Sequence, residues 1–294
     1  MPPTYLAVYW AVGLFVLGAC IGSFLNVCIY RLPAGMSIVW PPSRCSKCRK
    51  SIAWYDNLPV LSYLLLRGRC RHCGTKFSIQ YALVEALTGL VFCGFYLAYF
   101  LFQVRGEAFA RWDVYAVHMA LISALLVSSV IDFKTKEIYT VITNGGMVLG
   151  VVLCTFFPAL QSQSHTPAWS DNEHLNGLLG SLLGLVVGGG MIWVTAVLGK
   201  LAFRREAMGF GDVLLVGMIG AVLGWPGAVL TYFLAPFFGL VFGLWQYLRH
   251  REHEVPYGPF LSMAAVLVML TQGEIVAWFA PGLEGLQQAT HGGY

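Results

Sequence analysis

The sequence predicts an all-α polytopic membrane protein with about eight transmembrane helices. Hydrophobic residues make up 57% of its 294 residues and charged residues only 11%, whereas about a quarter of an average soluble domain is charged. Apolar runs of about 20 residues, the length that crosses the hydrocarbon layer, recur between charged breaks along the chain. Together these observations exclude an ordinary water-soluble domain.

Eight apolar runs are candidate spans. The first has no basic residue before Arg31, so we expect a retained helix and not a removable signal peptide. The sixth and seventh are separated only by Gly224-Trp225-Pro226-Gly227, which leaves open a re-entrant pair in place of two spans. The eight runs cover roughly residues 5–29, 81–103, 114–133, 139–160, 175–199, 208–224, 226–248 and 257–280.

The distribution of basic residues predicts the orientation. The loop at residues 31–76 contains nine of the chain's eighteen Lys and Arg residues and a single acid, Asp56. The positive-inside rule therefore places this loop in the cytoplasm. With eight spans, sixteen of the eighteen basic residues fall on that side and both termini lie outside the cytoplasm. The positive loop favours anionic membrane lipid as a partner, and we expect no nucleic acid partner.

Four cysteines in this loop form two CxxC pairs, Cys45/Cys48 and Cys70/Cys73. The 21 residues between the pairs are close to the spacing of a four-thiolate zinc site. A loop of about 50 residues buries little apolar surface, and a structural Zn²⁺ supplies on the order of 10 kcal/mol. Disulfides are rare in the cytoplasm, so we expect zinc. The alternatives are four free cysteines or a redox CxxC, although no thioredoxin-like βαβ pattern surrounds either pair.

Two aspartates lie where predicted spans meet the cytoplasmic boundary. Asp132 ends the third run and Asp212 begins the sixth, so both fall at the same membrane depth. An isolated acid at such a boundary is most simply a helix cap or a side chain that reaches water. Two adjacent carboxylates can instead share a proton and activate a water, as in aspartic proteolysis. Gly209 and Gly211 favour the approach of an extended substrate, because a residue without Cβ admits another backbone.

Several motifs in a fixed order resemble the type IV prepilin peptidase family of GxGD aspartic proteases. The resemblance extends from about residue 18 to 265 and begins with G-S-F-L-N-V-C-I-Y-R-L-P at residues 22–33. N-L-P-V-L-S-Y-L-L-L-R-G-R lies between the CxxC pairs, and F-S-I-Q-Y-A-L-V-E follows them. The Asp132 segment, G-F-G-D and P-Y-G-P-F-L complete the series.

The resemblance implies a bifunctional enzyme of the bacterial inner membrane with periplasmic termini. Asp132 and Asp212 are then the catalytic pair that removes the basic leader from a prepilin or pseudopilin. The cysteine loop serves N-methylation of the new pilin amino terminus from S-adenosylmethionine. Gly68 and Arg69 match a Gly-Lys pair of the family and become candidates for methyl transfer, although Arg and Lys are not interchangeable.

On this interpretation the chain has three parts. Residues 1–30 form the first transmembrane helix, residues 31–80 the four-cysteine zinc loop associated with methyl transfer, and residues 81–294 the peptidase core. Two positions depart from the family pattern: Tyr139 stands where proline is usual, and Leu214 where lysine is usual. Glu85 matches a family acid that either bonds within the core or contacts the loop. Residues 256–260 are expected, from topology alone, to line the approach to the aspartates.

Two functions of other classes remain open. An ion-coupled transporter would use the acids as a relay, but both acids cluster at one boundary and leave the bilayer middle without an ion path. A non-catalytic scaffold of a pilus or secretion machine would tolerate substitution of both aspartates. The sequence does not distinguish pilins from pseudopilins as the substrate, nor does it reveal the oligomeric state.

Overall fold

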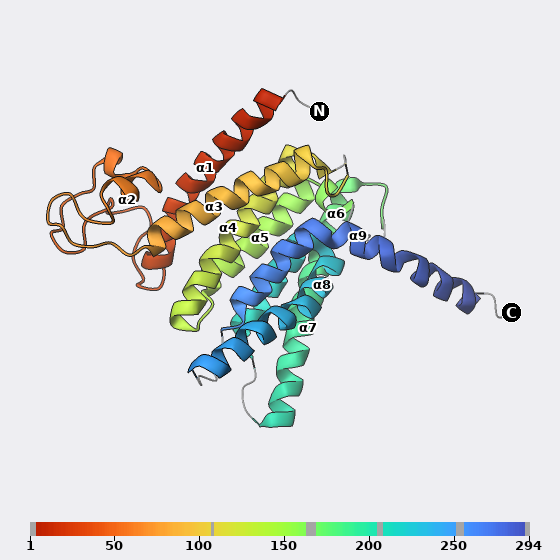
Figure 1. Ribbon diagram of the computed structural model, residues 1–294. Coiled ribbons are helices and arrows are strands. Elements are labelled where there is room, and N and C mark those ends of the chain that lie inside the picture. The colour runs from red at the N-terminus through yellow and green to blue at the C-terminus, as the bar shows by residue number, and fades with distance from the viewer. Residues whose placement is uncertain (1–3, 107–108, 163–168, 205–207, 251–255, 292–294) are drawn as a thin grey trace. The chain divides into compact units, whose positions relative to one another are not determined.

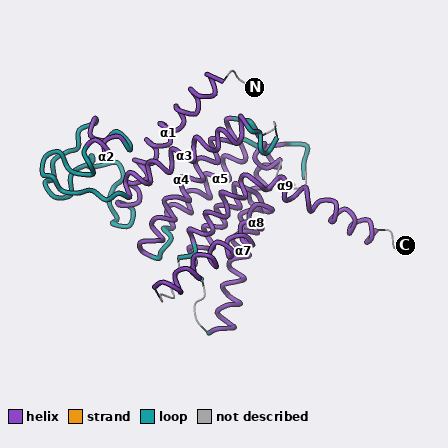
Figure 2. Tube along the Cα trace, viewed as in Figure 1, coloured by secondary structure: helices purple, strands orange, loops and turns teal. Residues whose placement is uncertain are grey.

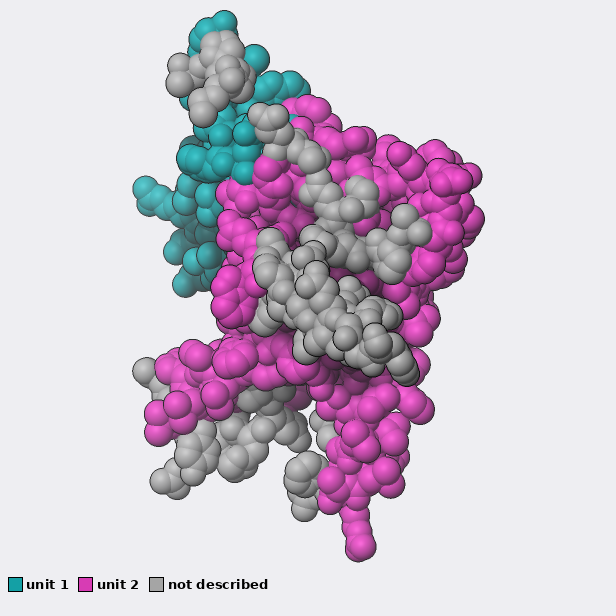
Figure 3. Space-filling model, turned by 90° about the vertical axis from the view of Figure 1, so that its right-hand side faces the viewer, with its two compact units in different colours: residues 1–103 teal, residues 104–294 magenta. Residues whose placement is uncertain are grey.

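The computed structural model describes residues 4–106, 109–162, 169–204, 208–250 and 256–291. Their regular structure is helical apart from two isolated β-bridges in the cysteine loop (Figures 1 and 2). The chain divides into two compact units, residues 1–103 and residues 104–294, coloured separately in Figure 3.

Unit 1 consists of two long helices and the cysteine loop between them. Helix α1 (Thr4–Arg31) packs against α3 (Gln80–Tyr96), which a π-helical turn (Leu97–Leu101) extends. The contact depends on glycine: a Cβ added at Gly18 would lie 2.8 Å from the carbonyl oxygen of Thr88, and one at Gly22 would lie 2.8 Å from Cα of Glu85. Gly18 and Gly22 form a GxxxG motif, which allows close approach of membrane helices. The loop contains only the 3₁₀ turn η1 (Trp54–Asn57) and the short helix α2 (Leu61–Leu65).

Unit 2 is a bundle whose interior is formed largely by one helix. It contains α4 (Trp112–Thr135), α5 (Thr140–Phe156), α6 (Ala159–Ser162), α7 (Glu173–Phe203), α8 (Phe210–His250) and α9 (Gly258–His291). Residues 215–223 of α8 are almost fully buried. α7 approaches α8 at Gly184, which meets the backbone of Gly220, and at Gly188, which meets Val216, whereas Gly180 faces Gln161 of α6. These glycines therefore serve helix packing.

Helix α8 bends sharply within the bundle. Gly224 has φ 72° and ψ 175°, outside the helical region, and Pro226 lacks a backbone N–H. This break leaves carbonyls one turn earlier without their usual helical donors, which is costly in lipid. Side chains of other helices supply the donors. Ser181 Oγ donates to the Ala221 carbonyl at 2.6 Å, Gln161 Nε2 to that of Val222 at 3.2 Å, and Gln272 Nε2 to that of Leu223 at 3.4 Å.

The predicted count of eight spans is not confirmed. Among the described residues, six helices are long and apolar enough to cross a membrane: α1, α3, α4, α7, α8 and α9. Helix α5 is apolar but only 17 residues long. The sixth and seventh predicted runs both lie in α8, where the non-helical Gly224 of the Gly224-Trp225-Pro226-Gly227 segment separates two helical segments.

Candidate active site and metal centre

The two CxxC pairs fold into the same local turn. The Cys45 N–H donates to the carbonyl of Lys50 at 3.0 Å, and the Cys70 N–H donates to that of Thr75 at 2.8 Å. Each turn is closed by an isolated antiparallel bridge, Arg44 with Ser51 and Arg69 with Lys76. The residue after each pair has a positive φ, 57° at Arg49 and 68° at Gly74. The equal spacing in sequence therefore produces two equivalent knuckles.

The knuckles bring the four thiols together. All four Sγ atoms lie within 4.8 Å of one another, and those of Cys45 and Cys73 are 3.7 Å apart. Tetrahedral coordination with Zn–S bonds of about 2.3 Å needs sulfurs about 3.8 Å apart. The cluster thus fits a metal ion of that size and geometry, and His72 is not part of it.

Hydrogen bonds favour the thiolate form at two of the four positions. The Thr75 hydroxyl lies 3.3 Å from Cys73 Sγ, and bonding to Thr75 lowers the pKa of Cys73 to about 6. Backbone bonds from Cys48 and Lys47 lower the pKa of Cys45. Because the thiolate is the ligand form, both effects favour metal binding. A backbone hydrogen bond lowers the pKa of Cys48, but burial and hydrogen bonds to the other three thiols raise it to about 11, so its thiolate forms only when the metal binds.

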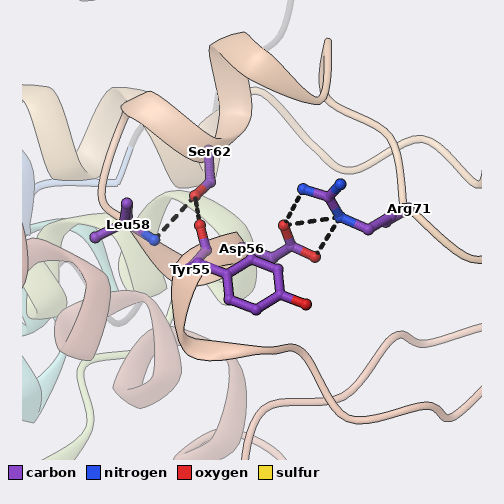
Figure 4. Close-up of polar contacts among 5 residues, drawn as sticks. All are labelled: Tyr55, Asp56, Leu58, Ser62 and Arg71. Carbon is purple, nitrogen blue, oxygen red and sulfur yellow. Dashed lines mark hydrogen bonds and ion pairs between the residues drawn. The ribbon is translucent and has the colours of Figure 1, made fainter.

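An ion pair fastens the rest of the loop to the second knuckle (Figure 4). Arg71, between Cys70 and Cys73, donates to both carboxylate oxygens of Asp56 at 2.6–3.0 Å, and its guanidinium lies 5.6 Å from the ring centre of Tyr55. The Ser62 hydroxyl accepts the Leu58 N–H and donates to the Tyr55 carbonyl. These bonds hold η1 and α2 against the cysteine cluster.

Gly68 and Arg69, the candidates for methyl transfer, form the entry to the second knuckle. Gly68 has φ 65°, and its N–H donates to the Tyr63 carbonyl at 2.8 Å. A Cβ at Gly68 would lie 2.8 Å from the Tyr63 ring. Arg69 begins the bridge with Lys76 and is exposed. The positive φ and the close Tyr63 ring thus explain why glycine occupies position 68. The role of Gly68 and Arg69 in methyl transfer stays a prediction.

Asp132 and Asp212 are both buried at helix ends in unit 2. Asp132 lies in the last turn of α4 with 4% of its surface exposed, and Asp212 lies in the first turn of α8 with 8% exposed. The two helices pack together. The carboxyl groups are close enough for their charges to interact. Residues 80 positions apart in the sequence therefore form one acidic site.

A third element, the start of α9, completes the site. The Gly258 N–H donates to Asp132 Oδ2 at 3.0 Å. Burial, and then the neighbouring Asp212 charge, raise the pKa of the Tyr257 phenol to about 12. Sequence reasoning placed residues 256–260 near the aspartates only from topology and assigned Gly258 and Tyr257 no role. The glycine in P-Y-G-P was the one sequence feature that could have indicated a close backbone contact at this position.

Ile138 connects these segments. A Cβ at Gly211 would lie 2.7 Å from Ile138 Cβ, and one at Gly258 would lie 3.2 Å from Ile138 Cδ1. Gly211 therefore leaves room for the Ile138 side chain. Gly209 is exposed, and a Cβ there would meet Asp212 Oδ2 only at an ordinary 3.8 Å. Sequence reasoning missed this use of Gly211, because nothing near Gly211 in sequence identifies Ile138.

Two family models match the chain. Residues 16–99 match the bacterial peptidase A24 N-terminal domain, and residues 119–244 match the type IV leader peptidase family. The first match covers the cysteine loop and the second covers both aspartates. No solved structure matches the chain.

Curated relatives share most of the sequence. A prepilin leader peptidase/N-methyltransferase of Pectobacterium carotovorum is 34% identical over 90% of this chain and 94% of its own length. One of Myxococcus xanthus is 37% identical over 82% of this chain, although the match spans 64% of that protein. A type 4 prepilin-like proteins leader peptide-processing enzyme of Escherichia coli is 30% identical over 87% of this chain and 91% of its own length.

Proposed function

This chain belongs to the type IV leader peptidase family, and from that premise we propose that Asp132 and Asp212 are the catalytic pair of a prepilin peptidase. The chain is thus an enzyme of the prepilin leader peptidase/N-methyltransferase type. The observation that carries the assignment of the pair is the burial of both carboxyls at one site, on helices that pack together.

The pair has the chemistry that peptide hydrolysis requires. Two nearby carboxyls cannot both ionise at low cost, so one retains a proton. The ionised carboxylate takes a proton from water, whose oxygen attacks the scissile carbonyl carbon. The protonated carboxyl donates to the leaving nitrogen as the C–N bond breaks. The exposed backbone at Gly209 forms the proposed approach for the extended leader junction, and Gly211, two residues later, contacts Ile138 at the base of that approach.

Separate Asp132→Asn and Asp212→Asn variants test the pair. Each is incubated with a prepilin and S-adenosylmethionine, and mass spectrometry reads the pilin amino terminus. We expect neither variant to remove the leader, and both to methylate a pilin whose leader has already been removed. Complete leader removal by either variant would contradict the paired mechanism.

The cysteine loop is proposed to hold Zn²⁺ and to serve the second activity. Cys45, Cys48, Cys70 and Cys73 would hold the ion, and their convergence supports the assignment. S-adenosylmethionine supplies the methyl group when bound. In this proposal Gly68 and Arg69 shape the methyl-transfer site on the loop. We expect one zinc per chain, absent from a Cys45→Ser, Cys48→Ser double variant. Zinc retention by that variant would place the metal elsewhere.

We place the protein in the inner membrane with the loop and the aspartates on the cytoplasmic side and both termini periplasmic. The nine basic residues at 31–76 support this orientation through the positive-inside rule and favour anionic lipid as a neighbour. Trypsin added to sealed inverted vesicles should cut this loop, and trypsin added to right-side-out spheroplasts should not. The reverse pattern would invert the topology.

A further inference from the structure

We propose that Gly258 is a positioning residue for leader cleavage: its backbone N–H holds the Asp132 carboxylate, and its missing side chain leaves the space which that carboxylate occupies. The inference rests on the proposed catalytic roles of Asp132 and Asp212. It adds a third segment, at the start of α9, to a site otherwise formed by the ends of α4 and α8.

The hydrogen bond joins two buried groups 126 positions apart. The Gly258 N–H donates to Asp132 Oδ2 at 3.0 Å, and both residues are buried. Gly258 is the first residue of α9, where backbone N–H groups have no partner within the helix. The N-terminus of a helix also carries partial positive charge, which favours a carboxylate. The bond engages Oδ2, so in the proposed mechanism Oδ1 is the oxygen that meets the catalytic water.

The space around Gly258 admits no side chain. A Cβ there would lie 2.7 Å from Asp132 Oδ2 and 3.2 Å from Ile138 Cδ1. Carboxylate oxygens and Cβ atoms do not approach so closely without a shift. The short Asp132 side chain on a packed helix can shift only by moving its carboxylate away from the N–H. An alanine at position 258 would therefore move the Asp132 carboxylate out of the position that the proposed mechanism requires.

The second contact of Gly258, to Ile138, allows a test of whether the glycine positions Asp132 or only avoids a clash with Ile138. Ile138→Val removes Cδ1, the Ile138 atom nearest to an added Cβ, and leaves the contact with Asp132 in place. If Gly258 only avoids a clash with its apolar neighbour, the Ile138→Val, Gly258→Ala double variant regains activity. If Gly258 positions Asp132, the double variant folds well but stays slow.

Steady-state kinetics of the full-length protein with a prepilin test the proposal. We expect Gly258→Ala to lower kcat for leader removal by about 10- to 100-fold, the scale of a 1 Å misplacement, with KM unchanged within about twofold. Methylation of a pre-cleaved pilin should stay at the unsubstituted rate. Gly190→Ala is the matched control, since nothing lies within 4 Å of its added Cβ, and should change neither constant.

Three results would overturn the inference: a normal kcat in Gly258→Ala, a loss confined to KM, or recovery of kcat in the double variant. Asp132→Asn, measured in parallel, separates the two levels of the argument. If it still cleaves, the proposed function itself fails. If it is inactive while Gly258→Ala is normal, only the role of Gly258 fails.

Discussion

The carboxylate of Glu85 accepts the backbone N–H of Val60 at 2.8 Å, so a buried acid on α3 holds a residue of the cysteine loop. Val60 has φ 61°, a conformation that is costly for a β-branched residue and persists only where its surroundings enforce it. Val60 immediately precedes helix α2. The Asp56–Arg71 pair connects η1, and through it α2, to the cysteine cluster. Glu85 therefore connects the membrane helix of unit 1 to the loop.

Replacing Glu85 should separate the two activities. Glu85→Ala leaves the part-buried Val60 N–H without its acceptor, at a cost of about 1–3 kcal/mol, so we expect slower methylation with leader removal unchanged. Glu85→Gln keeps an acceptor oxygen and should retain most methylation. Mass spectrometry of pilin products measures both reactions. Equal loss of both activities in the alanine variant would argue against a role confined to the loop.

The Asp56–Arg71 pair predicts a pH dependence of loop stability. Hydrogen bonding to Arg71 holds the pKa of Asp56 below its ordinary value. A lowered folded-state pKa adds stability above the unfolded-state pKa, near 4, and this is lost as pH falls through the folded-state value. Asp56→Asn should therefore increase hydrogen exchange of residues 54–71 at pH 7, and the difference should shrink as the pH falls below the ordinary aspartate pKa of about 4.

Asp113→Asn is the control for that experiment. It removes a similar two-point pair with Arg111 in unit 2 and should leave exchange of residues 54–71 unchanged. A difference between Asp56→Asn and the unsubstituted protein that persists at low pH would show that the side chain acts through something other than its charge.

Metal removal should unfold the cysteine loop selectively. A structural ion supplies on the order of 10 kcal/mol to a small metal-folded unit, and the loop has little apolar core of its own. A chelator should expose the basic residues of 31–76 to trypsin and abolish methylation, while leader removal persists because both aspartates lie in unit 2. Cys93→Ser, outside the cluster, should behave as the unsubstituted protein. Loss of leader removal along with the metal would require a link between the units.

The kink at Gly224 predicts a stability cost at Ser181. Ser181→Ala removes the shortest hydrogen bond to the Ala221 carbonyl, which Cys154 Sγ and Gln161 Nε2 also reach at 3.4 Å. Its loss should destabilise the protein by about 0.6–1.7 kcal/mol, the range for hydrogen bonds between membrane helices. Ser123→Ala is the control, because the Ser123 hydroxyl donates to Met119 of its own helix. Thermal unfolding in detergent measures both. Equal effects would mean that the kinked helix has no special need for the donor.

Tyr257 should contribute to cleavage as a neutral donor. Its phenol, with a pKa of about 12, stays protonated at every working pH. Tyr257→Phe should lower kcat by about 10-fold, the size of one hydrogen bond with a net contribution of about 1.4 kcal/mol. The size of the defect should be constant from about pH 6 to 9. A defect that grows with pH would indicate an ionising phenol instead.

Local features of the sequence predicted the class of the protein and the composition of its sites. Hydrophobicity and run length predict membrane helices because a bilayer imposes them segment by segment. The CxxC spacing predicted the thiol cluster because each knuckle closes within a few residues of its cysteines. The two aspartates were found because buried acids are rare in such helices. The predicted number of spans is not confirmed, since a glycine and a proline mark a loop between two spans and a kink within one equally well.

Contacts between distant segments were decided by tertiary structure alone. The sequence does not indicate that Gly258 meets Asp132, that Ile138 occupies the space beside Gly211, or that Ser181 serves a carbonyl of α8. Each of these contacts joins residues of different helices or loops, and it forms only when the whole bundle packs. Composition and spacing identify the reactive side chains, but helix packing determines which of them lie within hydrogen-bonding distance of one another.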